Sequence, residues 1–203
     1  MKRSRLKALA IAGCAVAMLA LPATGVFAAG GSSTLTITAG TSTISGAAPG
    51  NFTATLTGSD QQVYSSLGTF TAADLSGTGN GWHVTFQATH FACTSADTGC
   101  PAAGDTLPAS SLLLGVPTVA CHTGQSCSGR AAKPTISISS NTALDSGSAV
   151  TLASAATGTG MGTYDFTPAN ISGANTGLQT TVPSYAYATT YHTTLTVSLV
   201  SGP

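Results

Sequence analysis

Aspartate and histidine are the side chains in this sequence that could carry acid–base chemistry. There is no glutamate; the residues are Asp60, Asp74, Asp97, Asp105, Asp145 and Asp165 with His83, His90, His122 and His192. A glycosidase needs two carboxyl groups flanking the scissile bond, and no aspartate lies in a recognisable catalytic motif. Neither G-x-S-x-G nor H-E-x-x-H occurs. We therefore predict that the protein is not an enzyme.

Metal binding is also not expected. His83 and His90 differ by an odd number of positions, so a regular strand would send them to opposite faces. The segment 74–80 superficially resembles a calcium loop but lacks the repeated acidic ligands and the closing glutamate. A glycine-rich turn held by the Asp74 side chain is the favoured interpretation. We expect neither a metal nor a cofactor.

Four of the five cysteines, all after residue 28, could form disulfides or hold zinc. They are Cys93, Cys100, Cys121 and Cys127. The short spacings favour the pairs Cys93–Cys100 and Cys121–Cys127, although a bridge between the two loops is possible. Zinc is disfavoured because neither pair has the tight spacing of a structural zinc site. Residues 93–133 are rich in Gly, Pro and Cys, so they are predicted to be a disulfide-tied insertion.

Aromatic side chains offer the remaining chemistry, which is stacking on a sugar ring. The candidates for ligand binding are Trp82, Tyr185 and Tyr187. A core position is the favoured interpretation for Trp82, because Trp82, Val84, Phe86 and Ala88 would share one face of a strand. Tyr185 and Tyr187 follow Pro183, which favours an edge or a loop.

The elements that must position these residues are strands. Apolar residues alternate with threonine and serine in Ser33–Thr38, 51–57 and Pro134–Ser139, and this period of two is typical of half-buried strands. Two longer strands are expected within 81–91 and 191–199. Shorter ones are expected at 62–64, 68–70, 111–114, 150–153, 163–166 and 178–182. The predicted fold class is all-β, an antiparallel sandwich or barrel-like domain.

Charge is scarce and unevenly placed. Only 6% of residues are charged, and four of the six basic residues precede an apolar run from Ala8 to Leu21. This pattern predicts a signal peptide over residues 1–28, with cleavage after Ala28, and a single domain over 29–203. Cys14 raises the alternative of lipidation. The part after Ala28 carries two basic and six acidic residues, which excludes nucleic-acid binding through a basic patch, and no membrane span is expected there.

The two long strands resemble the WxL family of Gram-positive surface proteins, named for paired tryptophan-any-leucine motifs. The first motif comprises Asp74, the glycine-rich turn, Gly81, Trp82 and Val84. The second comprises Tyr191, Val197 and Leu199. Val84 stands where the family has leucine, and Val197 stands where it has tryptophan.

The resemblance implies a secreted protein that attaches non-covalently to the cell wall through peptidoglycan, with other surface proteins as further partners. An alternative function is a structural subunit of an extracellular assembly joined through strand edges. Long hydroxyl-rich strands with few charges lack the charged side chains that usually prevent edge strands from pairing with another chain.

Overall fold

The computed structural model describes residues 34–173 and 177–202. The predicted signal peptide and Cys14 lie outside the described residues. The chain divides into two units, Met1–Ile37 and Thr38–Pro203. In the first unit, residues 34–37 are not in a strand, and Leu35 and Ile37 are about 85% exposed. The strand predicted over Ser33–Thr38 is therefore wrong. Alternation favours a strand only where a neighbour can pair with it, and residues 34–38 pair with none of the described strands.

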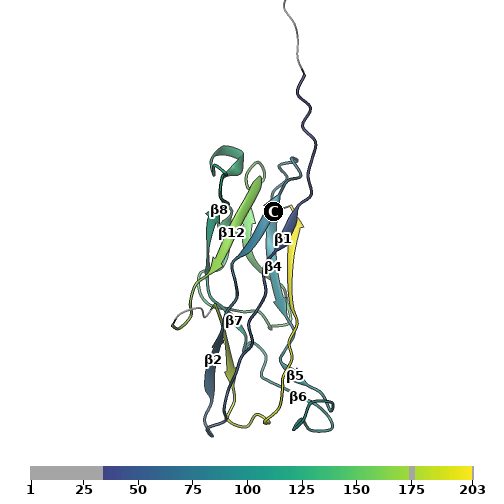
Figure 1. The fold of residues 1–203 in the computed structure, drawn as a ribbon, viewed down its shortest axis with the longest axis vertical. Coiled ribbons are helices and arrows are strands. Elements are labelled where there is room, and N and C mark those ends of the chain that lie inside the picture. Colours follow the sequence, from purple (N-terminus) through teal and green to yellow (C-terminus); the bar gives the residue numbers. More distant parts are fainter. Residues whose placement is uncertain (1–33, 174–176, 203) are drawn as a thin grey trace, which may run out of the picture. The chain divides into compact units, whose positions relative to one another are not determined.

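The second unit is all-β, as predicted. Its described residues contain one short 3-10 turn, Gly129–Ala131, and no α-helix (Figure 1). The strands are β1 (Thr43–Ser45), β2 (Gln61–Ser65), β3 (Phe70–Asp74), β4 (Trp82–Ala88), β5 (Ala92–Cys93), β6 (Asp105–Thr106), β7 (Leu113–Leu114), β8 (Pro117–Cys121), β9 (Thr135–Ile136), β10 (Thr142–Ala143), β11 (Val150–Ala155), β12 (Gly162–Pro168), β13 (Leu178–Val182) and β14 (Leu195–Ser201).

The strands form three four-stranded sheets and one two-stranded ribbon, and every pairing is antiparallel. The strand orders are β1-β3-β12-β8, β10-β7-β13-β2, β14-β4-β11-β9 and β5-β6. Aromatic rings join the first and third of these sheets. Phe70 of β3 lies 5.2 Å from Phe86 of β4, and Tyr164 of β12 lies 5.9 Å from Trp82 of β4, between ring centroids. The two sheets therefore pack face to face as a sandwich.

The two long predicted strands are direct neighbours. In β4 the buried positions alternate, so that Trp82, Val84, Phe86 and Ala88 all face the core. β14 pairs with β4 along its whole length, which places Leu199 opposite Val84 and Val197 opposite Phe86. Leu195, Val197 and Leu199 are partly buried against the same core. The predicted shared face of the first strand is confirmed. The second strand begins at Leu195 and not at Tyr191, so its predicted face is confirmed only for Leu195, Val197 and Leu199.

The segment 93–133 holds both disulfides in the favoured pairing, Cys93–Cys100 and Cys121–Cys127. The segment also contributes to the fold itself. β7 and β8 belong to two of the four-stranded sheets, and Leu107, Leu112 and Leu114 lie in the core. Apolar positions spaced among Gly, Pro and Cys are the reason that this segment packs inward.

The strand predicted over residues 51–57 is wrong. This segment lies beside β2, but its backbone carbonyls accept hydrogen bonds from side chains of β2 instead of backbone amides. Ser65 Oγ donates to the Asn51 carbonyl at 2.9 Å, and Gln61 Nε2 donates to the Thr55 carbonyl at 2.8 Å. These side chains stand between the two backbones, so a regular ladder cannot form there.

Most other predicted strands are present with shifted ends. The strand expected over Pro134–Ser139 is reduced to β9, Thr135–Ile136. The strands β11, β12 and β13 cover the residues expected for them.

Candidate ligand-binding groove

The glycine-rich turn before Trp82 is organised by the Asp74 carboxylate. Asp74 Oδ1 accepts hydrogen bonds from Ser42 Oγ at 2.9 Å, from the Ser76 amide at 3.1 Å and from Ser76 Oγ at 2.6 Å. Asp74 is only 5% exposed. A carboxylate next to its own turn residues satisfies backbone groups that the turn leaves unpaired. The predicted Asp-held turn is confirmed.

Gly81 is required by its surroundings. Its φ is +78°, and a Cβ built on it would lie 2.5 Å from the Ala155 carbonyl oxygen. Only glycine tolerates both the left-handed backbone and this close approach to β11. Gly81 therefore fixes the point at which β4 enters the sheet.

Trp82 lies in the core and not on a binding surface. It is 2% exposed, and its indole Nε1 donates a hydrogen bond to the Gly160 carbonyl at 2.7 Å. Its ring faces are therefore covered, and a saccharide cannot stack on them in this structure. Val84, its partner in the first motif, is fully buried. The motif residues on β4 and β14 hold the two strands to one core.

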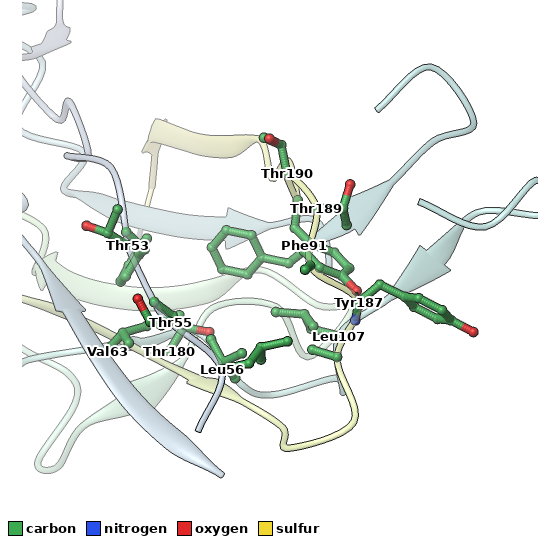
Figure 2. Close-up of a pocket in the computed structure, with 16 residues that line it drawn as sticks. Thr53, Thr55, Leu56, Val63, Phe91, Leu107, Thr180, Tyr187, Thr189 and Thr190 are labelled. Carbon is green, nitrogen blue, oxygen red and sulfur yellow. Dashed lines mark hydrogen bonds between the residues drawn. The ribbon is translucent and has the colours of Figure 1, made fainter. Parts of the chain in front are cut away.

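A groove of about 690 Å³ lies beyond the other end of β4, about 20 Å along the strand from Trp82. Figure 2 shows side chains that surround it. One wall is the extended segment 52–56, and the other is the chain from Ala186 to Tyr191. The remaining lining residues, which join the two walls, are Val63, Phe91, Leu107, Thr180 and Val182.

The groove combines an apolar surface with threonine hydroxyls. The larger apolar side chains are Phe52, Leu56, Val63, Phe91, Leu107 and Val182; the threonines are Thr53, Thr55, Thr180, Thr189 and Thr190. None of the lining residues is charged. Such a surface suits a ligand that has apolar faces and hydroxyl or amide groups.

Two of these threonines have unsatisfied hydroxyls. Thr180 is 2% exposed, and the Oγ1 atoms of Thr180 and Thr189 are buried with no hydrogen-bond partner. Leaving a buried hydroxyl unpaired costs about 1–3 kcal/mol. Native proteins rarely keep such a group without a reason, and both of these groups lie in the wall of the same groove.

The tyrosines of the C-terminal loop differ in whether they line the groove. Tyr187 lines the groove and is 51% exposed, whereas Tyr185 is 75% exposed and does not line it. Tyr191 also lines the groove; its hydroxyl donates to Asp105 Oδ2 at 2.7 Å and accepts from the Tyr187 amide at 3.2 Å. Burial and the bond to Asp105 raise the pKa of Tyr191 to about 12, so this phenol stays neutral at physiological pH.

Of the three aromatic candidates, only Tyr187 therefore reaches the groove. Thr180, Phe52 and Phe91 are groove residues that the sequence did not single out as ligand-binding. The alternation over 51–57 did mark Phe52 and Thr53, but as members of a paired strand. Nothing in the sequence of β13 distinguishes Thr180 from a core threonine.

Three of the four histidines, His83, His122 and His192, contact a carboxylate or a backbone carbonyl. His122 Nδ1 lies 3.0 Å from both Asp165 carboxylate oxygens, and His192 Nε2 lies 2.9 Å from Asp97 Oδ1. His83 Nδ1 lies 2.9 Å from the Gly202 carbonyl. Within residues 34–173 and 177–202, no group of three or more His, Cys, Asp or Glu side chains is placed to hold a metal ion. In the same residues, no helix is long and apolar enough to cross a membrane.

Comparison with known proteins places the chain in a family. The family model described as "WxL domain surface cell wall-binding" matches residues 32–203, which is nearly the whole chain. The chain therefore belongs to the WxL family, a family of wall-binding domains and not of enzymes. No curated protein and no solved structure matches the chain significantly.

Proposed function

We propose that the protein is exported and associates non-covalently with the peptidoglycan of the bacterial cell wall, without catalysing a reaction there. The observation that carries this proposal is the WxL match over residues 32–203. The composition of residues 1–28 supports export. Two short-range disulfides are compatible with an oxidising exterior.

The lining of the groove favours attachment through apolar contacts and hydrogen bonds over attraction between opposite charges. The two basic residues after Ala28 are Arg130 and Lys133, and neither lines the groove. Lys133 Nζ donates to the Val119 carbonyl on β8. An anionic wall polymer would therefore find no cluster of cations to bind.

Cosedimentation with purified Gram-positive cell walls tests this function. The folded protein is expected in the pellet with the walls and in the supernatant without them. Recovery in the supernatant in both cases, with folding confirmed by circular dichroism, would refute wall binding. The same samples test the absence of catalysis, because no soluble wall fragments should accumulate in the supernatant.

A structural role as a subunit of an extracellular assembly joined through strand edges is the less favoured function. The family to which the chain belongs is described by wall binding. A wall stripped of protein should therefore still bind the domain.

A further inference from the structure

We propose that the groove between segment 52–56 and the chain from Ala186 to Tyr191 binds the glycan strand of the wall, as a neutral N-acetylated saccharide, and not its charged components. This inference rests on the proposed wall-binding function and names the part of the wall that this site contacts. Peptidoglycan combines uncharged N-acetylated sugars with peptides that carry carboxylates and amines, and it is often accompanied by phosphate-bearing polymers.

The absence of charge in the groove lining selects among these ligands. A carboxylate or phosphate would lose its water on entering the groove and would gain no cation, which is unfavourable. The Asp105 carboxylate is bonded to Tyr191 of the lining, and it would repel an anion. An uncharged saccharide incurs neither penalty.

The groove lining matches the two kinds of surface that a saccharide presents. The C–H face of a pyranose and an acetyl methyl are apolar and complement the partly exposed Phe52 and the exposed Leu56 of the lining. Tyr187 offers a half-exposed ring at the edge of the groove. Sugar hydroxyls and the acetamido group can donate and accept hydrogen bonds. They could therefore serve as the missing hydrogen-bond partners of the Thr180 and Thr189 hydroxyls.

Thr180 supplies the most specific evidence. Its hydroxyl is buried and unpartnered, and it belongs to the wall of the groove. Rotation of the side chain between its staggered rotamers can turn the hydroxyl toward a group seated there. A saccharide hydroxyl or carbonyl would then supply the hydrogen-bond partner that the Thr180 hydroxyl lacks within the protein.

The backbone of segment 52–56 offers further polar groups. Ser65 and Gln61 hold the carbonyls of Asn51 and Thr55, whereas the amides from Phe52 to Leu56 donate to no backbone carbonyl of the described residues. These amides can therefore bond to ligand oxygen atoms without disrupting a sheet.

The test is a titration of the folded domain with a β-1,4-linked tetramer of N-acetylglucosamine, followed by NMR shifts or calorimetry. Saturable binding is expected, with shifts confined to the groove residues. Thr180→Val keeps the shape of the side chain and removes the hydroxyl; it should weaken binding about three- to tenfold while the thermal midpoint is unchanged or raised. Thr196→Val, on the exposed face of β14, is the matched control and should bind normally.

Three results would overturn the proposal. They are no binding of the tetramer, equal binding by wild type and Thr180→Val, and competition by a wall peptide or a polyol phosphate in place of the saccharide. Cosedimentation with walls is a separate measurement. If the domain sediments with walls but does not bind the tetramer, the glycan site is refuted and the proposed wall binding is not.

Discussion

At the scale of single residues, Gly81 and Trp82 decide how β4 enters the sandwich. Gly81 adopts a backbone that side chains disfavour and touches β11, and Trp82 immediately fills the core and bonds to Gly160. The two residues act through packing. Their substitutions should therefore change stability first, and wall binding only through loss of the fold.

Trp82→Phe removes the indole hydrogen bond together with a small part of the buried ring volume. The phenyl ring retains most of the apolar contact, but the Gly160 carbonyl loses its donor, which should lower the free energy of unfolding by about 1–3 kcal/mol. Urea unfolding followed by circular dichroism measures this loss. Wall binding per folded molecule should stay at the wild-type level; an unchanged unfolding curve with lost binding would instead indicate a ligand role for Trp82.

Gly81→Ala and Gly77→Ala form a matched pair. Both glycines have positive φ, +78° and +69°, but an added Cβ meets the Ala155 carbonyl only at Gly81. Gly77→Ala should cost about 1–2 kcal/mol for the left-handed backbone alone. Gly81→Ala should cost clearly more in the same unfolding assay. Equal losses would show that the contact with β11 is unimportant.

At the scale of elements, the Asp165 carboxylate links three neighbouring strands. It lies on β12, accepts a hydrogen bond from Thr71 of β3 and contacts His122 just after β8. The bonds to His122 and Thr71 lower the pKa of Asp165 below its usual 3.8, against the opposing effect of burial. A carboxylate whose pKa is lowered by folding contributes stability above its unfolded pKa, and loses it as the pH falls through the folded value.

The urea midpoint of the wild type should therefore fall as the pH is lowered from about 5 to below the usual aspartate range. Asp165→Asn removes this titration and should show a shallower dependence over the same window. The variant is expected to be less stable than the wild type at pH 6 and closer to it at the acid end. Parallel curves for the two proteins would contradict the link.

The elements also show what sequence patterns can and cannot predict. Alternation predicted β4 and β14 and the faces that they bury. It did so because the two strands pair with each other, and pairing keeps alternate side chains on opposite faces of the sheet. The same alternation failed at 51–57, where Gln61 and Ser65 interpose their side chains. The groove could not be predicted, because it depends on that separation and on an unpartnered hydroxyl at Thr180 within an ordinary strand sequence.

At the scale of the whole molecule, the scarcity of charge predicts that wall binding depends little on salt. The sequence after Ala28 has a formal net charge of −4, with two basic residues. Attachment through an uncharged groove releases few counterions, so added salt should have little effect. Raising NaCl from about 50 to 500 mM should change the dissociation constant for walls by less than about twofold; loss of binding in high salt would indicate ionic attachment instead.

The WxL motif residues on β4 and β14 pack into the core, whereas the proposed contact with the wall lies in the groove. Ala54 lies exposed in the groove wall, so Ala54→Trp should fill the groove without disturbing the core. Ala120→Trp places the same side chain at an exposed position of β8, away from the groove, and serves as its control.

The most direct test is the fraction of each folded protein that sediments with purified peptidoglycan. If the groove contacts the wall, the wild type and Ala120→Trp are bound alike, and the affinity of Ala54→Trp falls at least about tenfold. Equal sedimentation of all three proteins would contradict it.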